Sequence, residues 1–78
     1  MTNSCIRYES ELKKAKDTLA TLLKHRQEID AKLLINPISS ELHKDLRTVN
    51  LEIRITNNEI ELVESNLLEC ESKINQTT

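Results

Sequence analysis

The sequence predicts an all-α protein: an antiparallel two-helix coiled-coil hairpin, completed to a bundle by self-association or by a partner helix. Three observations predict this fold. Apolar residues recur at alternating steps of three and four, the one proline divides the chain into two such stretches, and the two stretches are symmetric about that proline. The 78 residues include no glycine, and aromatic residues make up 1%, a composition typical of long helices.

The first predicted helix covers residues 3–35. Its apolar residues are spaced alternately by three and by four positions. A seven-residue repeat of this kind places all of them on one face of a helix, the seam of a coiled coil. Arg26 is the one strongly polar member of the seam, which consists of Cys5, Tyr8, Leu12, Ala15, Leu19, Leu22, Arg26, Ile29 and Leu33.

The stretch LLINPISSEL then predicts a corner at residues 36–39. Pro37 disfavours helical backbone at the residue before it and fits the first turn of a helix. Either Asn36 or Ser39 is expected to cap the second helix, which covers residues 39–75. The second helix carries a seam of the same kind, formed by Leu42, Leu46, Val49, Ile53, Thr56, Ile60, Val63, Leu67, Cys70 and Ile74.

The two seams predict how the helices pair. When the chain is folded at the corner, facing seam residues have numbers that add up to 75, from Cys5 with Cys70 to Leu33 with Leu42. Nine layers share this centre, as an antiparallel hairpin requires and two unrelated seams do not. The same register predicts three favourable flanking pairs between the helices and one unfavourable pair, Glu9 with Glu64. The favourable pairs are Lys32 with Asp45, Asp30 with His43, and His25 with Glu52.

Length and charge limit the classes of protein. Residues 1–78 form a single domain, short enough that a partner is expected to help stabilise it. The net charge of −2, from 11 basic and 13 acidic residues, argues against nucleic-acid binding. The opening MTNSCIRYESELKKAK has no apolar run long enough for a signal peptide, and no segment reaches the roughly 20 apolar residues of a membrane span. We therefore expect a cytoplasmic location and no membrane partner.

Cys5 and Cys70 share the last predicted layer, and three interpretations remain open. They are two buried thiols, as is usual in the cytosol, or a disulfide that clasps the open end of the hairpin, or metal ligands. His25 and His43 lie many turns away and cannot join the cysteines around a metal. We expect no metal and no cofactor.

A second apolar stripe lies off the predicted seam. Leu51, Ile55 and Leu62 are four and seven residues apart, on the far side of the second helix, with Asn58 between them. We expect these three residues to contact a protein partner, either an amphipathic helix or a second copy in a homodimer. Arg26 is expected to act as a specificity element, because a polar residue in a seam fixes register or partner choice. No nucleophile, base and orienting residue are placed to converge, and there is no glycine for a phosphate-binding loop, so we expect no enzyme.

The hairpin with its NPISSEL corner resembles the small two-helix co-chaperones of type III secretion needle subunits, and needle-type hairpins themselves. The resemblance covers most of the chain at the level of pattern, and it implies a co-chaperone that keeps a helical protein soluble before export. Two alternatives are a phage or mobile-element inhibitor protein and a dimeric four-helix-bundle regulator that binds nucleic acid. The regulator would use a basic face on the first helix, formed by Lys13, Lys14, Lys16 and Lys24.

Overall fold

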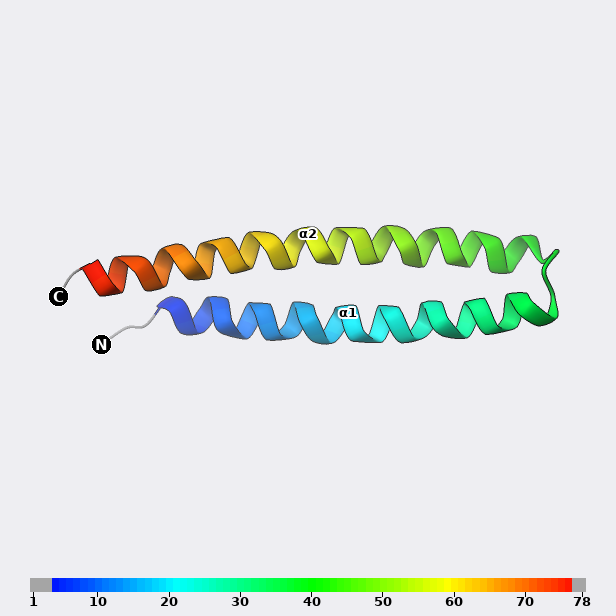
Figure 1. Ribbon diagram of the computed structural model, residues 1–78, viewed down its shortest axis with the longest axis horizontal. Coiled ribbons are helices and arrows are strands. Elements are labelled where there is room, and N and C mark those ends of the chain that lie inside the picture. Colours follow the sequence, from blue (N-terminus) through cyan, green and yellow to red (C-terminus); the bar gives the residue numbers. More distant parts are fainter. Residues whose placement is uncertain (1–3, 77–78) are drawn as a thin grey trace.

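The computed structural model describes residues 4–76 as two antiparallel helices joined by a short corner (Figure 1). Helix α1 spans Ser4–Ile35 and helix α2 spans Ser40–Gln76. Together they form a rod of 61 × 15 × 13 Å, with the corner at one end and the beginning of α1 beside the end of α2 at the other. The predicted all-α hairpin is therefore confirmed for the described residues. The predicted start of the first helix, at residue 3, lies outside them.

The corner ends one helix and caps the next. The Asn36 N–H still donates to the Lys32 carbonyl at 2.9 Å, as in a last helical turn. The Ser39 hydroxyl accepts a hydrogen bond from the Leu42 N–H at 3.2 Å. Because Ser39 thus satisfies a free N–H of the first turn of α2, it is the N-cap, and of the two predicted candidates Asn36 does not have this role.

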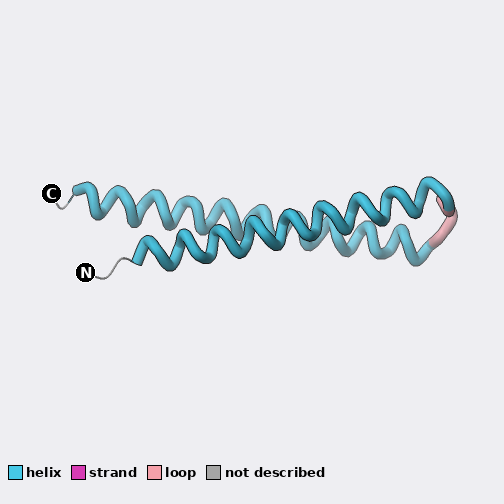
Figure 2. Tube along the Cα trace, turned by 90° about the horizontal axis from the view of Figure 1, so that it is seen from below, coloured by secondary structure: helices cyan, strands magenta, loops and turns pink. Residues whose placement is uncertain are grey.

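The buried face of each helix is its predicted seam. In Figure 2 the two helices cross along the rod, as expected of seams that repeat every seven residues. Apart from Glu11, Ser39 and Asn66, every described side chain that is not exposed belongs to a seam. The side chain of Ile74 lies outside the described residues. The buried or half-buried seam residues are Cys5, Tyr8, Leu12, Ala15, Leu19, Leu22, Arg26, Ile29, Leu33, Leu42, Leu46, Val49, Ile53, Thr56, Ile60, Val63, Leu67 and Cys70.

The depth of burial depends on side-chain shape. The fully buried seam positions hold short or β-branched side chains, whereas every seam leucine is only half-buried. Two helices make a single layer, so a longer side chain extends past its edge into solvent. Thr56 is the one buried polar residue among the described residues, and its hydroxyl donates to the Glu52 carbonyl at 2.8 Å. The hairpin therefore has a narrow core, centred on Ile29, Val49 and Ile53.

The predicted flanking pairs differ from the ion pairs that form. His25 Nδ1 lies 3.9 Å from Glu28, one turn along its own helix, instead of beside Glu52. His43 Nε2 lies 2.8 Å from the Pro37 carbonyl oxygen, at the corner. Exposed pairs are worth only about 0–1 kcal/mol, so a nearby partner in the same helix competes well with one across the seam. Among the described residues, the ion pair that joins the two helices is Lys16 with Glu64, at 4.0 Å.

Candidate functional site

The three residues predicted to bind a partner lie in one exposed line on α2. Leu51 is 55% exposed, Ile55 is 56% exposed and Leu62 is 62% exposed. Leu51 lies two residues before the seam residue Ile53, and Ile55 lies two residues after it. Two residues turn a helix by about 200°, so both side chains point away from α1. We call this line, Leu51, Ile55 and Leu62, the outer stripe.

Polar residues continue the outer stripe at both ends. The same alternation of three and four residues links the apolar members to Asn58 in the middle, and all of these side chains are exposed. The alternation is that of a second coiled-coil seam, on the opposite side of α2 from the first. From one end to the other, this second seam reads Lys44, Thr48, Leu51, Ile55, Asn58, Leu62, Ser65 and Glu69.

A second apolar surface lies at the corner. Leu34 is 87% exposed, Ile35 is 88% exposed and Ile38 is 89% exposed. Ile35 and Ile38 were not identified from the sequence. Their position beside Pro37, outside both seams, could have indicated their exposure, because no facing helix is left there to cover them.

Arg26 lies in the seam, half-buried, as its place in the repeat predicts. Its guanidinium Nη1 donates to Asn50 Oδ1, an exposed contact of 3.4 Å between the helices. The side chain therefore packs its stem in the seam and carries its charge to the edge, where it meets an amide and not the carboxylate of Glu52.

We expect Arg26→Met to raise the free energy of unfolding by about 1 kcal/mol, because an apolar side chain of similar length removes the cost of holding a charge beside the core. Urea unfolding followed by circular dichroism, at one fixed protein concentration, measures the change. Asn50→Ala is the control, and its cost should stay within about 0.5 kcal/mol because the contact is exposed. A loss of stability in Arg26→Met would contradict this account.

Cys5 and Cys70 form a disulfide at the open end of the hairpin, with their Cα atoms 5.8 Å apart. Of the three interpretations of this pair, the structure contains the disulfide and not the two reduced thiols or a metal site. Within residues 4–76, no three His, Cys, Asp or Glu side chains come together in a way that would hold a metal ion. The register predicted from the two seams is what brings the two cysteines into one layer.

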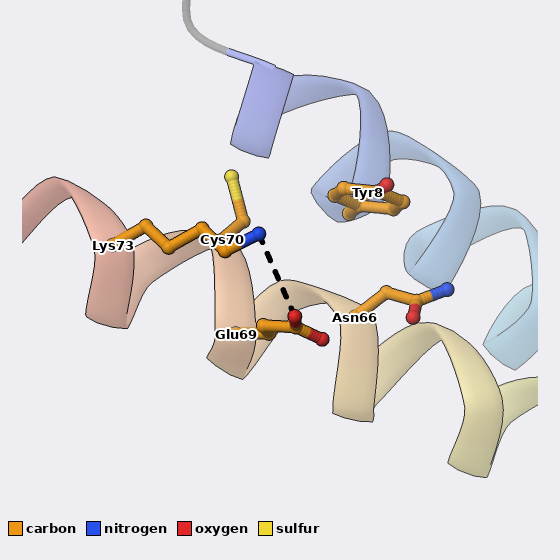
Figure 3. Close-up of a pocket in the computed structure, with 5 residues that line it drawn as sticks. All are labelled: Tyr8, Asn66, Glu69, Cys70 and Lys73. Carbon is orange, nitrogen blue, oxygen red and sulfur yellow. Dashed lines mark ion pairs between the residues drawn. The ribbon is translucent and has the colours of Figure 1, made fainter.

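A hollow of about 220 Å³ lies beside this disulfide (Figure 3). Tyr8 contributes its ring from α1, and the other lining residues come from α2. Two of these lining residues form an ion pair one turn apart on α2: Lys73 Nζ lies 3.5 Å from a Glu69 oxygen, and both side chains are largely exposed. The two cysteine sulfurs are bonded to each other, so the hollow contains no cysteine thiol.

The fold and its surfaces define a class: an antiparallel helical hairpin with an outward apolar stripe. Neither helix has a stretch, within the residues described, that is long and apolar enough to cross a bilayer. Comparison of the chain with models of protein families, with curated protein sequences and with solved structures finds no match. A function for this chain is therefore inferred from its own surfaces.

Proposed function

We propose that this chain is a non-enzymatic protein-interaction module that binds a helix through the outer stripe. The supporting observation is that three large apolar side chains, each more than half exposed, share one line on α2. Removing such side chains from water is favourable, and an amphipathic helix laid along the line is the simplest way to do it. Because the outer stripe lies on the side of α2 away from α1, the bound helix, α2 and α1 would lie side by side in one row.

The more specific role is that of an adaptor or a small co-chaperone. In this role the outer stripe covers the apolar face of a partner helix and keeps the partner from aggregating. The resemblance of the hairpin to type III secretion co-chaperones favours this role over an inhibitor protein. A basic face for nucleic acid is thin by comparison, since Lys16 is paired with Glu64 of α2.

The disulfide bears on where the protein would act. A persistent disulfide is typical of oxidising compartments, whereas thiols in the cytosol are mostly kept reduced. The cytoplasmic location expected from the sequence therefore stays a prediction. The thiol state of Cys5 and Cys70 in the native host would test it.

The test replaces the outer stripe by glutamine, a good helix former, in Leu51→Gln/Ile55→Gln/Leu62→Gln. A tagged chain is expressed in the native host, cross-linked in the cells and purified, and the proteins bound to it, including its own copies, are identified by mass. We expect the wild type to capture a protein and this stripe variant to lose it, while the helical content measured by circular dichroism stays unchanged.

The matched control removes three exposed apolar residues elsewhere, in Leu34→Gln/Ile38→Gln/Leu68→Gln. These side chains are 87%, 89% and 68% exposed, so the control lowers apolar surface at least as much. It should retain the captured protein. If the stripe variant keeps every partner, or if the control loses the partner instead, binding is not at the outer stripe and the proposal fails.

A further inference from the structure

The polar and apolar residues along the second seam are arranged symmetrically. Reading inward from its two ends, Lys44 corresponds to Glu69, Thr48 corresponds to Ser65, and Leu51 corresponds to Leu62. Ile55 and Asn58 occupy the middle. The order of properties is thus the same in both directions with two exceptions. The charges at the two ends have opposite signs, and the apolar Ile55 corresponds to the polar Asn58.

We infer that the helix that covers the outer stripe is α2 of a second copy of this chain, packed antiparallel about a two-fold axis between residues 56 and 57. This inference rests on the proposed function, and it names the partner. In this register Leu51 faces Leu62 of the second copy, and Thr48 faces its Ser65. Lys44 faces the second copy's Glu69, which closes each end of the contact with an opposite charge.

Other registers do not preserve this match. A shift of the second copy by one heptad places Leu62 against Lys44 in one direction and Leu51 against Glu69 in the other, so that apolar side chains meet charges. A parallel arrangement places each residue against its own copy, and like charges then meet at both ends of the seam. The antiparallel register centred between residues 56 and 57 is the one that pairs leucine with leucine and lysine with glutamate.

The residues that flank the second seam add one favourable and one unfavourable kind of contact between the two copies. On one side Arg54 comes beside Glu61 of the second copy, twice because of the two-fold axis. On the other side Glu52 comes beside the second copy's Glu59. The two flanks therefore offset each other, and the charges at the ends of the seam determine the direction. Near the axis, Asn58 faces Ile55 of the second copy, so each of the two central layers holds one polar and one apolar side chain.

The geometry gives the assembly a definite shape. The outer stripe and the first seam lie on opposite sides of α2, as the exposure of Leu51 and the burial of Ile53 indicate. Two hairpins joined along α2 therefore form a flat row of four helices, with the two α2 helices in the middle and an α1 helix at each edge. This arrangement differs from a square four-helix bundle, in which all helices share one core.

Disulfide cross-linking tests the register in the full chain. Two single variants, Leu51→Cys and Leu62→Cys, are purified with the native disulfide intact, then oxidised separately and as a mixture. We expect a covalent dimer in the mixture, with the new bond mapped by mass spectrometry to positions 51 and 62. Neither variant alone should give one, because in this register the two copies of position 51 are about 16 Å apart, beyond the reach of a disulfide.

Charge reversal gives an independent measurement. Lys44→Glu should weaken dimerisation by about three- to tenfold in sedimentation equilibrium, because it places two glutamates together at each end. The double variant Lys44→Glu/Glu69→Lys should restore the wild-type dissociation constant. The inference is overturned if the wild type is dimeric but each single variant forms a covalent dimer by itself. It is also overturned if the wild type is dimeric and none of the samples forms a covalent dimer. So does a wild type that is monomeric and binds a different protein through the outer stripe overturn it. The proposed function survives a parallel dimer or a different partner on the outer stripe, whereas a dimer that forms no cross-link in any sample counts against it.

Discussion

Removing the disulfide between Cys5 and Cys70 should lower the free energy of unfolding by about 4 kcal/mol, because the bond closes a loop across a sequence separation of 65 residues. A domain of this size has a total stability of roughly 4–12 kcal/mol, so the loss is a large share of it. The expected decrease in melting temperature is roughly 15–30 °C. Thermal unfolding followed by circular dichroism, with and without a phosphine reductant, measures it.

The double variant Cys5→Ala/Cys70→Ala separates the covalent bond from the packing of the side chains. Cys5 is 4% exposed, so a small apolar replacement keeps its position filled without adding a buried hydroxyl. This variant should melt where the reduced wild type melts, and the reductant should not change it further. If reduction moves the melting temperature of the wild type by less than about 5 °C, the disulfide contributes little and the seam alone stabilises the hairpin.

Hydrogen exchange should show which part of the hairpin loses stability when the disulfide is removed. The disulfide joins the first turn of α1 to the last turns of α2, at the end of the rod away from the corner. Without it, the amides near this open end should exchange first, and those around Ile29 and Val49 should exchange last. Uniform exchange along both helices would mean that the hairpin opens as one unit.

The seams were the part of this fold that sequence reasoning could predict. A repeat of three and four over nine layers has many members, and each adds a small preference for the same face. Errors at single positions do not disturb such a pattern: Arg26 and Thr56 are polar, yet both lie in the seam. Since the two seams share a centre, the register followed as well, and with it the approach of Cys5 to Cys70.

The single polar contacts were beyond the same reasoning. His25, His43 and Arg26 each have several exposed partners within reach, and the differences in free energy between them are a few tenths of a kcal/mol. The structure pairs them with Glu28, the Pro37 carbonyl and Asn50, and none of these was predicted. The corner surface was missed for another reason: no repeat marks residues that face no helix.

The seven-residue repeat also could not predict whether the two cysteines are bonded. Two cysteines in one layer are compatible with a disulfide or with two thiols, and the oxidation state depends on the compartment as well as on distance. The outer stripe was visible in the sequence as spacing, and its exposure is visible in the structure. Our proposal that a second copy covers it rests on the charges at its two ends, because its apolar residues would suit many helices.

The second large effect is expected at the centre of the core. Ile29 is 3% exposed and packs in the cluster with Val49 and Ile53. Ile29→Ala should cost about 3 kcal/mol, because it removes buried methyl groups and leaves a cavity between two long helices that cannot close fully around it. Urea unfolding with the disulfide intact measures the loss. Ile35→Ala is the matched control: the same substitution in the same helix, at a residue that is 88% exposed, should change stability by no more than about 0.5 kcal/mol.

The core and the disulfide should act independently, since Ile29 is 24 residues from Cys5 along α1, or about 36 Å. Their losses should then add up to about 7 kcal/mol, as much as or more than the stability expected of many domains of this size. Ile29→Ala should consequently remain folded while the disulfide is intact and lose most of its helical signal when it is reduced. Reduced Ile35→Ala should keep that signal to the same extent as the reduced wild type. If reduced Ile29→Ala stays as helical as the reduced wild type, the narrow seam is not what holds the two helices together.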